Sequence, residues 1–358
     1  MTRRERVFTA LRGGMADRLP FTCYLNLVPR GETERRLREE GLSLLLRRRV
    51  MSTVTPNVES ERGEYWQDGK RVVRQTYRTP VGEVSETYRT GGGYGTSLRC
   101  EFPIKRPEDY EVVRFMVQDE VYTPAYEGFL ADVDTMGEDG AVIGTLGYTP
   151  MMRMLVYLMG PERFAMDMRE RPTDFFGLYE AIAERHREMH QIAADSPADV
   201  FIYGDNITSE MIGLERFQEY VIPRYNEFAS ILHERGKLIG VHMDGKMTHL
   251  AEAVAESDID IVEAFAAFPD GDLPIGDARR AWSEKVIWTN FPSPVHLYAP
   301  EDIEEYTRGM LADIAPGDRF LVGITENVPD NVWQQSMSVI SRVLKEEGAL
   351  PLGGVGSR

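Results

Sequence analysis

A regular alternation of short β-rich runs and amphipathic helical segments constrains this fold more than any other feature of the sequence. Each run is rich in apolar residues that favour strands, and a segment with apolar residues at helical spacing follows it. The runs are residues 141–146, 200–204, 237–242, 259–264, 285–289 and 319–324. Strands that alternate with helices pair in parallel through right-handed crossovers, so the chain is an α/β protein with either a doubly wound sheet or a closed barrel.

Two further strands bring the expected number to about eight, the number in a TIM barrel. We expect one at residues 18–27 and another between residues 109 and 121. No expected strand is followed by the GxGxxG pattern of a dinucleotide-binding sheet. The sequence therefore favours a TIM barrel, whose active site would lie at the carboxyl ends of its strands.

A different pattern interrupts this order between residues 54 and 88. Apolar and polar residues alternate from Val73 to Tyr77, and turn sequences such as Asp68-Gly69 separate the runs. Alternation of this period is typical of antiparallel strands joined by tight turns. We expect an inserted β-meander in the N-terminal part of a single barrel domain that spans residues 1–358.

The charge balance excludes one large class of partners. The chain carries 41 Lys and Arg against 58 Asp and Glu, a formal net charge of −17. Such a charge repels phosphate backbones, and no basic stripe with interleaved aromatic residues opposes it locally, so we expect no nucleic-acid partner. The best candidate for a membrane span, residues 151–159, carries Arg153 and is much shorter than the roughly 18 residues of a membrane helix. We therefore expect no membrane partner. Residues 7–12, after the basic N-terminal residues, are too few to form the apolar region of a signal peptide, so we expect a cytoplasmic protein.

The cysteines limit the kinds of metal site that this chain can build. Only Cys23 and Cys100 occur, and neither has a CxxC partner. This excludes a disulfide framework and a zinc ribbon. A metal in this protein must therefore use histidine and carboxylate ligands.

Polar residues follow several of the expected strands, where a barrel places its chemistry. Asp205 and Asn206 follow residues 200–204, and Asn290 follows residues 285–289. Taken singly, each can equally be a loop residue or the N-cap of the next helix. Their common position favours the pocket, with Asp205 and Asn206 as candidate catalytic residues and Asn290 as a candidate substrate contact.

The pair formed by His242 and Asp244 is a more specific pattern. Residues i and i+2 of a strand face the same side, so this pair directs an imidazole and a carboxylate into one space. Glu326, after the last strand, can supply a third ligand, with Glu263 in reserve. One histidine and two carboxylates suit zinc, iron or manganese with open coordination positions, which also makes His242 a candidate catalytic residue. The alternative is a hydrogen bond between His242 and Asp244 that only orders the loop.

Two further histidines, His186 and His190, stand four residues apart on an expected helix. That spacing can also bind a metal, but Arg185 and Arg187 flank the first histidine and favour a solvated helix face. We therefore expect both histidines at the surface.

Motifs in a shared order along nearly the whole chain resemble one protein family. They are Arg3-Arg4-Glu5-Arg6-Val7, Asp17-Arg18-Leu19-Pro20-Phe21, Gly204-Asp205-Asn206, His242-Met243-Asp244-Gly245 and Gly323-Ile324-Thr325-Glu326-Asn327. Together they resemble the uroporphyrinogen decarboxylase superfamily, which includes corrinoid-dependent methyltransferases. The resemblance implies a single distorted TIM barrel with the active site at its mouth.

The segment after the first strand separates two branches of this family. True uroporphyrinogen decarboxylases carry an RQAGRY sequence there, whereas residues 24–30 read Tyr-Leu-Asn-Leu-Val-Pro-Arg. A tetrapyrrole with many carboxylates needs several cations in its cleft, and this segment offers only Arg30. Porphyrinogen decarboxylation is therefore the second choice. Within this segment we expect Tyr24, Asn26 and Arg30 to contact the substrate.

The methyltransferase branch binds zinc through an HxC pair and a later cysteine. In this sequence Asp244 stands at the position of the first cysteine and Glu326 close to that of the second, while His242 is retained. Oxygen ligands give a harder metal site that favours an oxygen leaving group over a thiolate. The resemblance thus implies a metal-dependent methyltransferase, with zinc or another divalent metal. It would move a methyl group from a small methylated substrate, with an aryl methyl ether as a candidate, to a corrinoid on a partner protein. A ligand-binding barrel without catalysis is the third interpretation.

Overall fold

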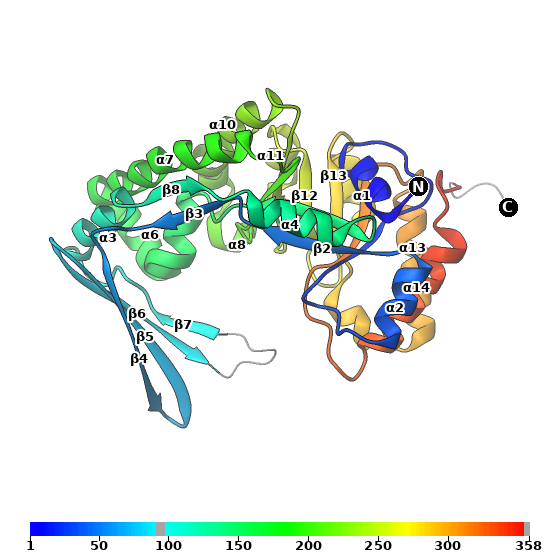
Figure 1. The fold of residues 1–358 in the computed structure, drawn as a ribbon, viewed down its shortest axis with the longest axis horizontal. Helices are drawn as coiled ribbons and strands as arrows, with labels where there is room; N and C mark the ends of the chain where they lie inside the picture. Colours follow the sequence, from blue (N-terminus) through cyan, green and yellow to red (C-terminus); the bar gives the residue numbers. More distant parts are fainter. Residues whose placement is uncertain (91–96, 354–358) are drawn as a thin grey trace. The chain divides into compact units, whose positions relative to one another are not determined.

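Eight parallel strands close into a barrel in the computed structural model, which describes residues 1–90 and 97–353 (Figure 1). The barrel strands pair in chain order, and the last strand pairs with the first to close the ring. The strands are β1 (Phe21–Tyr24), β2 (Leu42–Arg48), β9 (Gly140–Thr145), β10 (Val200–Tyr203), β11 (Leu238–His242), β12 (Ile261–Ala266), β13 (Val286–Asn290) and β14 (Phe320–Ile324). This architecture confirms the α/β TIM barrel expected from the alternation of strands and helices.

The positions of two expected strands need correction. The segment between residues 109 and 121 forms helix α3 (Asp109–Gln118), because its buried apolar residues recur at helical spacing. The missing barrel strand is β2, whose sequence is rich in leucine and arginine rather than in β-branched residues. The first strand is shorter than residues 18–27, since β1 pairs with its neighbours only from Phe21 to Tyr24.

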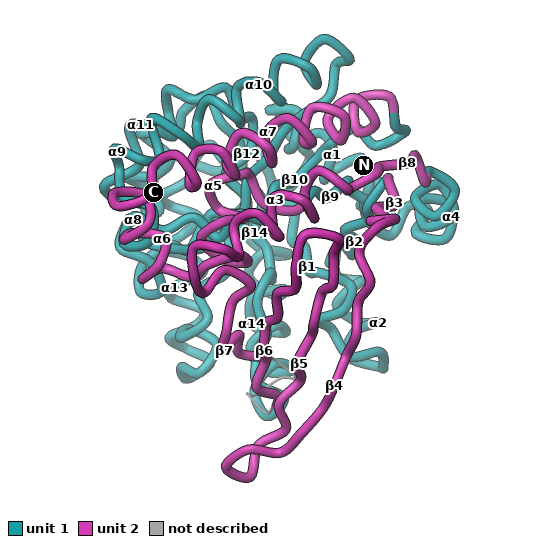
Figure 2. Tube along the Cα trace, turned by 90° about the vertical axis from the view of Figure 1, so that its left-hand side faces the viewer, with its two compact units in different colours: residues 1–50, 126–146, 196–358 teal, residues 51–125, 147–195 magenta. Residues whose placement is uncertain are grey.

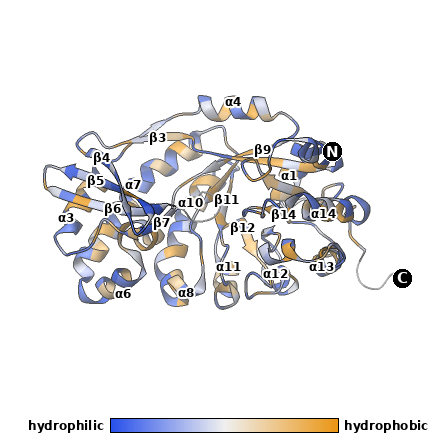
Figure 3. Ribbon diagram, turned by 90° about the horizontal axis from the view of Figure 1, so that it is seen from below, coloured by the Kyte–Doolittle hydropathy of each residue, from blue (hydrophilic) through white to orange (hydrophobic). Residues whose placement is uncertain are grey.

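Helix α1 (Arg3–Leu11) belongs to the hydrophobic core of the barrel. It starts with a capping box between Thr2 and Glu5. Its apolar residues join a buried cluster with strand residues, which includes Val7, Ala10, Leu11, Val200, Ile202, Ile261, Val286 and Trp288. Figure 3 shows the corresponding hydrophobic colour along strands such as β9 and β12. Full burial of such a side chain contributes about 1.5–3 kcal/mol, so this cluster is a main source of the stability of the barrel.

Helices follow the barrel strands, as parallel pairing requires. Outside residues 51–125 and 147–195, they are α2 (Glu32–Glu40), α4 (Glu127–Met136), α8 (Ser209–Ile212), α9 (Leu214–Arg216), α10 (Ile222–His233), α11 (Ala251–Glu256), α12 (Ile275–Ala281), α13 (Pro300–Asp313) and α14 (Trp333–Glu347). Short turns of 3₁₀ or π type occur at Phe217–Val221, Thr248–Leu250 and Ser293–Leu297.

The chain divides into two compact units (Figure 2). The first contains residues 1–50, 126–146 and 196–358, and the second contains residues 51–125 and 147–195. All eight barrel strands and every site residue predicted from the sequence lie in the first unit.

An antiparallel meander forms much of the second unit and is longer than residues 54–88. Its strands pair in the order β4 (Glu59–Gln67), β5 (Lys70–Thr79), β6 (Gly82–Thr90) and β7 (Ser97–Glu101). A separate antiparallel pair, β3 (Met51–Val54) with β8 (Val121–Pro124), joins the two ends of the inserted segment. The meander confirms the expected insertion, and the fourth strand extends it.

The rest of the second unit is helical, and its longest helix corrects one expectation. The elements are α5 (Pro150–Arg153), a π-helical stretch (Met154–Met159), α6 (Gly160–Glu170) and α7 (Pro172–Asp195). His186 and His190 on α7 are buried, not at the surface. They continue the apolar stripe of the helix, which includes Ile182, Met189 and Ala193. The flanking arginines were therefore a poorer guide than the helical spacing.

Candidate metal centre

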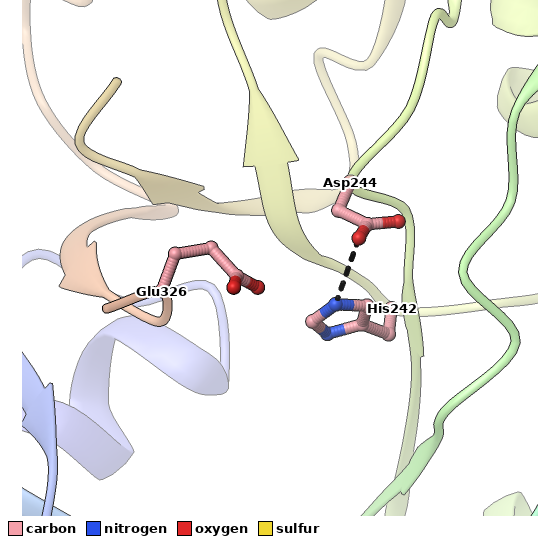
Figure 4. Close-up of side chains that lie close together, drawn as sticks. All are labelled: His242, Asp244 and Glu326. Atoms are coloured by element: carbon pink, nitrogen blue, oxygen red, sulfur yellow. Dashed lines mark ion pairs between the residues drawn. The ribbon is translucent and has the colours of Figure 1, made fainter. Parts of the chain in front are cut away.

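His242 is the last residue of β11 and stands at the carboxyl end of the barrel. Its side chain is buried, whereas Asp244, two residues later, is partly exposed. Nε2 of His242 lies 3.5 Å from Oδ2 of Asp244 (Figure 4). One short strand end thus brings an imidazole and a carboxylate into the same space.

Backbone contacts between two neighbouring loops hold this strand end in place. The N–H of Ile207 donates to the carbonyl oxygen of His242 at 3.3 Å, and the N–H of Gly245 donates to that of Ile207 at 3.1 Å. A Cβ atom at Gly245 would lie 2.1 Å from Cβ of Thr208. The close approach of the two loops therefore requires glycine directly after Asp244.

Glu326 reaches the same space from the other side of the barrel mouth. It follows β14 by two residues, and its carboxylate points toward the imidazole of His242 (Figure 4). One potential ligand atom from each of His242, Asp244 and Glu326 lies within 4.8 Å of the others. The structure thus brings together the three residues that the sequence indicated as metal ligands.

Glu263 on the adjacent strand supports the histidine and is not part of this cluster. In the strand register Glu263 lies opposite His242, and its Oε2 is 2.6 Å from Nδ1 of His242. The hydroxyl of Tyr24 donates a hydrogen bond to its other oxygen, Oε1. Both oxygens of this fully buried carboxylate are therefore engaged, and Glu263 contacts Nδ1 of His242 instead of joining the cluster.

A β-bulge places the Glu263 side chain. The register between β12 and β13 shifts between Glu263 and Phe265. Ala264, between them, has a φ of 56°, a left-handed conformation that is rare for a residue with a Cβ atom. Bulges next to functional sites commonly redirect a side chain, and this one lies beside the histidine partner.

The electrostatics of the buried pair favour an ion pair. Burial alone would lower the pKa of His242, but the charges and hydrogen bonds of Glu263 and Asp244 outweigh it and raise the pKa to about 10. Burial alone would raise the pKa of Glu263, yet His242 and Tyr24 hold it below its usual value. The carboxylates therefore impose a negative potential around the imidazole.

The same negative potential acts on the carboxyl group of Glu326. Removal of water raises its pKa, and the charges of Asp244 and Glu263 raise it further against the opposing charge of His242. A cation between these groups would relieve the repulsion of the carboxylates.

The chemistry of the three side chains fits a divalent metal. One imidazole nitrogen and two carboxylates are ligands that zinc, iron and manganese accept, with positions left for substrate. A ligating histidine usually binds a carboxylate through its other ring nitrogen, which fixes the orientation of the ring. Glu263 makes this contact with Nδ1 of His242 and leaves Nε2 facing Asp244.

The structure separates the two candidate catalytic residues that follow β10. Asp205 is fully buried, and its Oδ2 accepts a hydrogen bond of 2.6 Å from the hydroxyl of Tyr225 on α10. Asn206 is exposed and has a φ of 49°, in the left-handed region where Asn is comparatively common. Neither belongs to the metal cluster of His242.

The four candidate substrate contacts also differ in their surroundings. Tyr24 is buried against Glu263, and Asn290 is buried with its Oδ1 accepting from the N–H of Thr325 at 3.0 Å. Asn290 thereby holds the turn that precedes Glu326, which is a positioning role. The other two, Asn26 and Arg30, are exposed, and Arg30 forms an ion pair of 3.0 Å with Glu34.

Sequence reasoning missed two residues of this region. The guanidinium carbon of Arg47 lies 4.2 Å from the ring centroid of Tyr24, a cation–π contact. Arg47 belongs to β2, the strand that the sequence pattern did not reveal. Tyr225, the partner of Asp205, lies on a predicted helix, but its contact depends on how α10 returns to the barrel.

A closed parallel barrel with a polar cluster at the carboxyl ends of its strands defines the class of TIM-barrel enzymes. The sequence model of one family within this class, "Uroporphyrinogen decarboxylase (URO-D)", matches residues 100–345. The chain therefore belongs to the uroporphyrinogen decarboxylase family.

Among solved structures, a methyltransferase from Methanosarcina mazei is similar in fold. The TM-score is 0.60 at 11% sequence identity, and the match covers 97% of this chain and 99% of that chain. At this identity the likeness concerns the fold alone. No curated protein matches the chain in sequence.

Within the part of the chain that the structure describes, no helix has both the length and the apolar character needed to cross a bilayer.

Proposed function

We propose that this chain is a metal-dependent methyltransferase of the URO-D family. It removes a methyl group from a small methylated substrate, with an aryl methyl ether as the leading candidate, and the acceptor is a corrinoid carried by a partner protein. The observation that carries this function is the orientation of His242. Its Nδ1 is held by Glu263 at 2.6 Å, while its Nε2 faces Asp244 beside Glu326.

The nature of the ligands favours an oxygen leaving group. Neither cysteine belongs to the metal cluster of the described residues, and burial raises the pKa of Cys23 to about 12, so that its thiol stays protonated. Zinc or another divalent cation held by His242, Asp244 and Glu326 would act as a Lewis acid toward the ether oxygen, an effect of several kcal/mol. Carboxylate ligands suit this harder chemistry better than thiolates do.

Buried residues orient the side chains of the His242, Asp244 and Glu326 cluster, and exposed residues at nearby strand ends are left to contact the substrate. Glu263 and Tyr24 orient His242, and Asn290 holds the turn before Glu326. We place Asn206 and Asn26, which are exposed at the ends of their strands, as substrate contacts. Asp205 is buried and accepts a hydrogen bond from Tyr225, so its role is to position the end of β10 and not to touch the substrate.

A decarboxylase for a tetrapyrrole polycarboxylate is the second candidate and has less support. Such a substrate needs several cations, but Arg30 is paired with Glu34 and Arg47 lies over the ring of Tyr24. The strand ends instead present the carboxylates of Asp244 and Glu326. We expect no turnover of uroporphyrinogen, measured by chromatography of the oxidised porphyrin products. Stepwise loss of its acetate carboxyl groups would contradict this choice of branch.

Metal content tests the proposed function most directly. Wild-type protein equilibrated with zinc and then desalted should retain one equivalent by plasma mass spectrometry, and His242→Ala should retain none. His233→Ala is the matched control, because His233 pairs with Asp260 at 2.9 Å outside the cluster. Wild-type protein that retains no zinc, iron or manganese would contradict the proposed metal centre.

A second measurement separates an enzyme from a ligand-binding barrel. Zinc-loaded protein is incubated with reduced cobalamin and a panel of aryl methyl ethers, and methylcobalamin is followed by its absorbance. Formation of methylcobalamin with wild-type but not with His242→Ala supports the methyltransferase. Zinc binding without transfer to cobalamin or to any corrinoid protein favours the ligand-binding barrel.

A further inference from the structure

Strand β4 (Glu59–Gln67) is an open edge of the four-stranded sheet in the second unit. It pairs with β5 on one side, and no strand pairs with its other side among residues 1–90 and 97–353. All nine of its residues are exposed, and the side chain of Trp66 is the most prominent, at 74% exposure. An unpaired edge of this length is a ready template for another strand.

The turn at the end of β4 determines which residues present their backbone to the open edge. Asp68 and Gly69 both have positive φ, 50° and 70°, as in a type I′ hairpin turn. In such a turn Gln67 and Lys70 form a hydrogen-bonded pair, and bonded and non-bonded pairs alternate along the ladder. The odd-numbered residues of β4 therefore bond to β5. The residues that direct their N–H and C=O groups outward are Ser60, Arg62, Glu64 and Trp66.

This pattern restricts how a second copy of β4 can add in the antiparallel direction, since outward residues must pair with outward residues. The central registers place Arg62 opposite Arg62, Glu64 opposite Glu64, or Arg62 opposite Glu64. The first two oppose like charges, which is unfavourable. The third pairs opposite charges twice, because the two-fold axis repeats the pair. It also places Gly63 opposite Gly63 on the axis.

In the same register, the exposed side chain of Trp66 lies beside residues of the second copy that can pack against it. Trp66 lies opposite Ser60 of the second copy, a small residue, and diagonally next to Arg62 of that copy. Diagonal neighbours are within reach of an aromatic and a long side chain, and an arginine beside an indole gains a cation–π contact. Within one chain Arg62 already lies 3.3 Å from Glu64, and Glu64 also pairs with Arg71 of β5. Side-chain exposures of 62% for Arg62 and 40% for Glu64 leave room for a further partner across the edge.

We propose that β4 pairs with β4 of a second copy of this chain and forms a two-fold symmetric dimer with one continuous antiparallel sheet. Charged side chains often protect a sheet edge from association, but they do so best when they repel across the edge. Here the charges that flank the axis are complementary, and an exposed tryptophan lies beside them.

A disulfide at the two-fold axis tests the register. Gly63 forms a non-hydrogen-bonded pair with itself, with Cα atoms about 4.5 Å apart, which a disulfide can bridge. A Cβ atom at Gly63 meets nothing within 4 Å, so Gly63→Cys should fold. The exposed Cys100 is first replaced by serine, whereas the buried Cys23 is left in place. Mild oxidation by copper phenanthroline should link Gly63→Cys chains into dimers on a non-reducing gel.

Ser60→Cys in the same background is the control. In the proposed register the two copies of residue 60 are about 20 Å apart and cannot be joined. Equal crosslinking of both variants, or crosslinking of Ser60→Cys alone, would overturn the register. Absence of crosslinking in both would overturn the dimer.

Charge variants provide a test that does not depend on cysteine. Arg62→Glu and Glu64→Arg should each lose the dimer, as measured by light scattering coupled to size-exclusion chromatography. An equimolar mixture should regain it, because every cross-strand pair is again of opposite charge. Far-UV circular dichroism checks that both variants fold. A wild-type chain that stays monomeric at high concentration, or a dimer unaffected by either variant, would contradict the proposal.

Discussion

Nδ1 of His242 and Oε2 of Glu263 lie 2.6 Å apart, on residues that occupy matching positions of neighbouring barrel strands. The contact occupies Nδ1 of the imidazole and leaves Nε2 facing Asp244. The strand register, together with the bulge at Ala264, therefore orients the ring before any ligand arrives. This arrangement makes Glu263 the residue on which the geometry of the site depends.

Glu263→Gln should weaken metal binding without removing it. The amide keeps the shape of the side chain but loses the charge that orients His242, and such changes commonly cost 10–100-fold in metal affinity. A zinc competition titration with a chromophoric chelator measures the change. The control is Glu210→Gln, which removes an exposed ion pair of 2.5 Å with Lys246. Equal affinities of wild-type and Glu263→Gln would show that Glu263 has no positioning role.

Tyr225→Phe should destabilise the barrel. The variant removes a hydrogen bond of 2.6 Å to the buried side chain of Asp205, and loss of one partner of a buried hydrogen bond costs about 1–3 kcal/mol. Urea unfolding followed by circular dichroism measures the loss. Tyr306→Phe is the comparison, because the Tyr306 hydroxyl donates to the carbonyl oxygen of Phe268 at 2.7 Å in an exposed hydrogen bond. A loss for Tyr225→Phe no larger than that for Tyr306→Phe would contradict the argument from burial.

His296 should make the protein sensitive to mild acid. It is buried, with Nδ1 2.6 Å from the hydroxyl oxygen of Ser336, and burial lowers the pKa of His296 to about 4. The unfolded chain, with a histidine pKa of about 6.5, binds a proton between these values and the folded chain does not, so stability falls as the pH drops from 6.5 to 4. The full effect is about 3 kcal/mol.

The measurement for His296 compares wild-type with His296→Gln by urea unfolding at a series of pH values. Other groups titrate in the same range, so the relevant quantity is the difference between the two proteins. This difference should change in favour of the variant as the pH falls below 6.5. A constant difference over that range would mean that His296 takes up its proton at the same pH in the folded and in the unfolded chain.

The two compact units should unfold together, as a single domain over residues 1–358 requires. The chain crosses four times between them, at residues 50, 125, 146 and 195, so neither unit is made of one continuous segment. Trp66 belongs to the second unit, and the other tryptophans, Trp282, Trp288 and Trp333, belong to the first. Fluorescence of Trp66→Phe therefore follows the first unit, and far-UV circular dichroism follows both. Coincident urea curves are expected, and two separate midpoints would contradict a single domain.

Much of the fold and the composition of the metal cluster could be predicted from the sequence, because both depend on order along the chain. Parallel strands in a barrel end at one mouth, so polar residues after successive strands come together even when they are far apart in sequence. This brought His242, Asp244 and Glu326 together. Binding of a metal there is still a prediction.

The supporting residues could not be predicted in the same way, because they depend on register and on local irregularities. The role of Glu263 follows from its place opposite His242 and from the bulge at Ala264, and neither is visible in the hydrophobic pattern. Arg47 was missed because a strand rich in leucine and arginine resembles a helix in composition. The burial of His186 could have been predicted, since it continues an apolar stripe.

The short antiparallel pair of β3 with β8 should let this barrel tolerate changes in the length of the segment inserted between residues 50 and 126. Met51 lies opposite Pro124, so the first and last parts of the inserted segment are neighbours in space. The barrel strands β2 and β9 pair directly with each other, and α4, which precedes β9, already supplies the crossover between them. A segment whose two ends meet can lengthen, shorten or be exchanged without moving the strands on either side of it. The junction between residues 50 and 126 is therefore where related barrels are expected to differ most in length while keeping the same strand order.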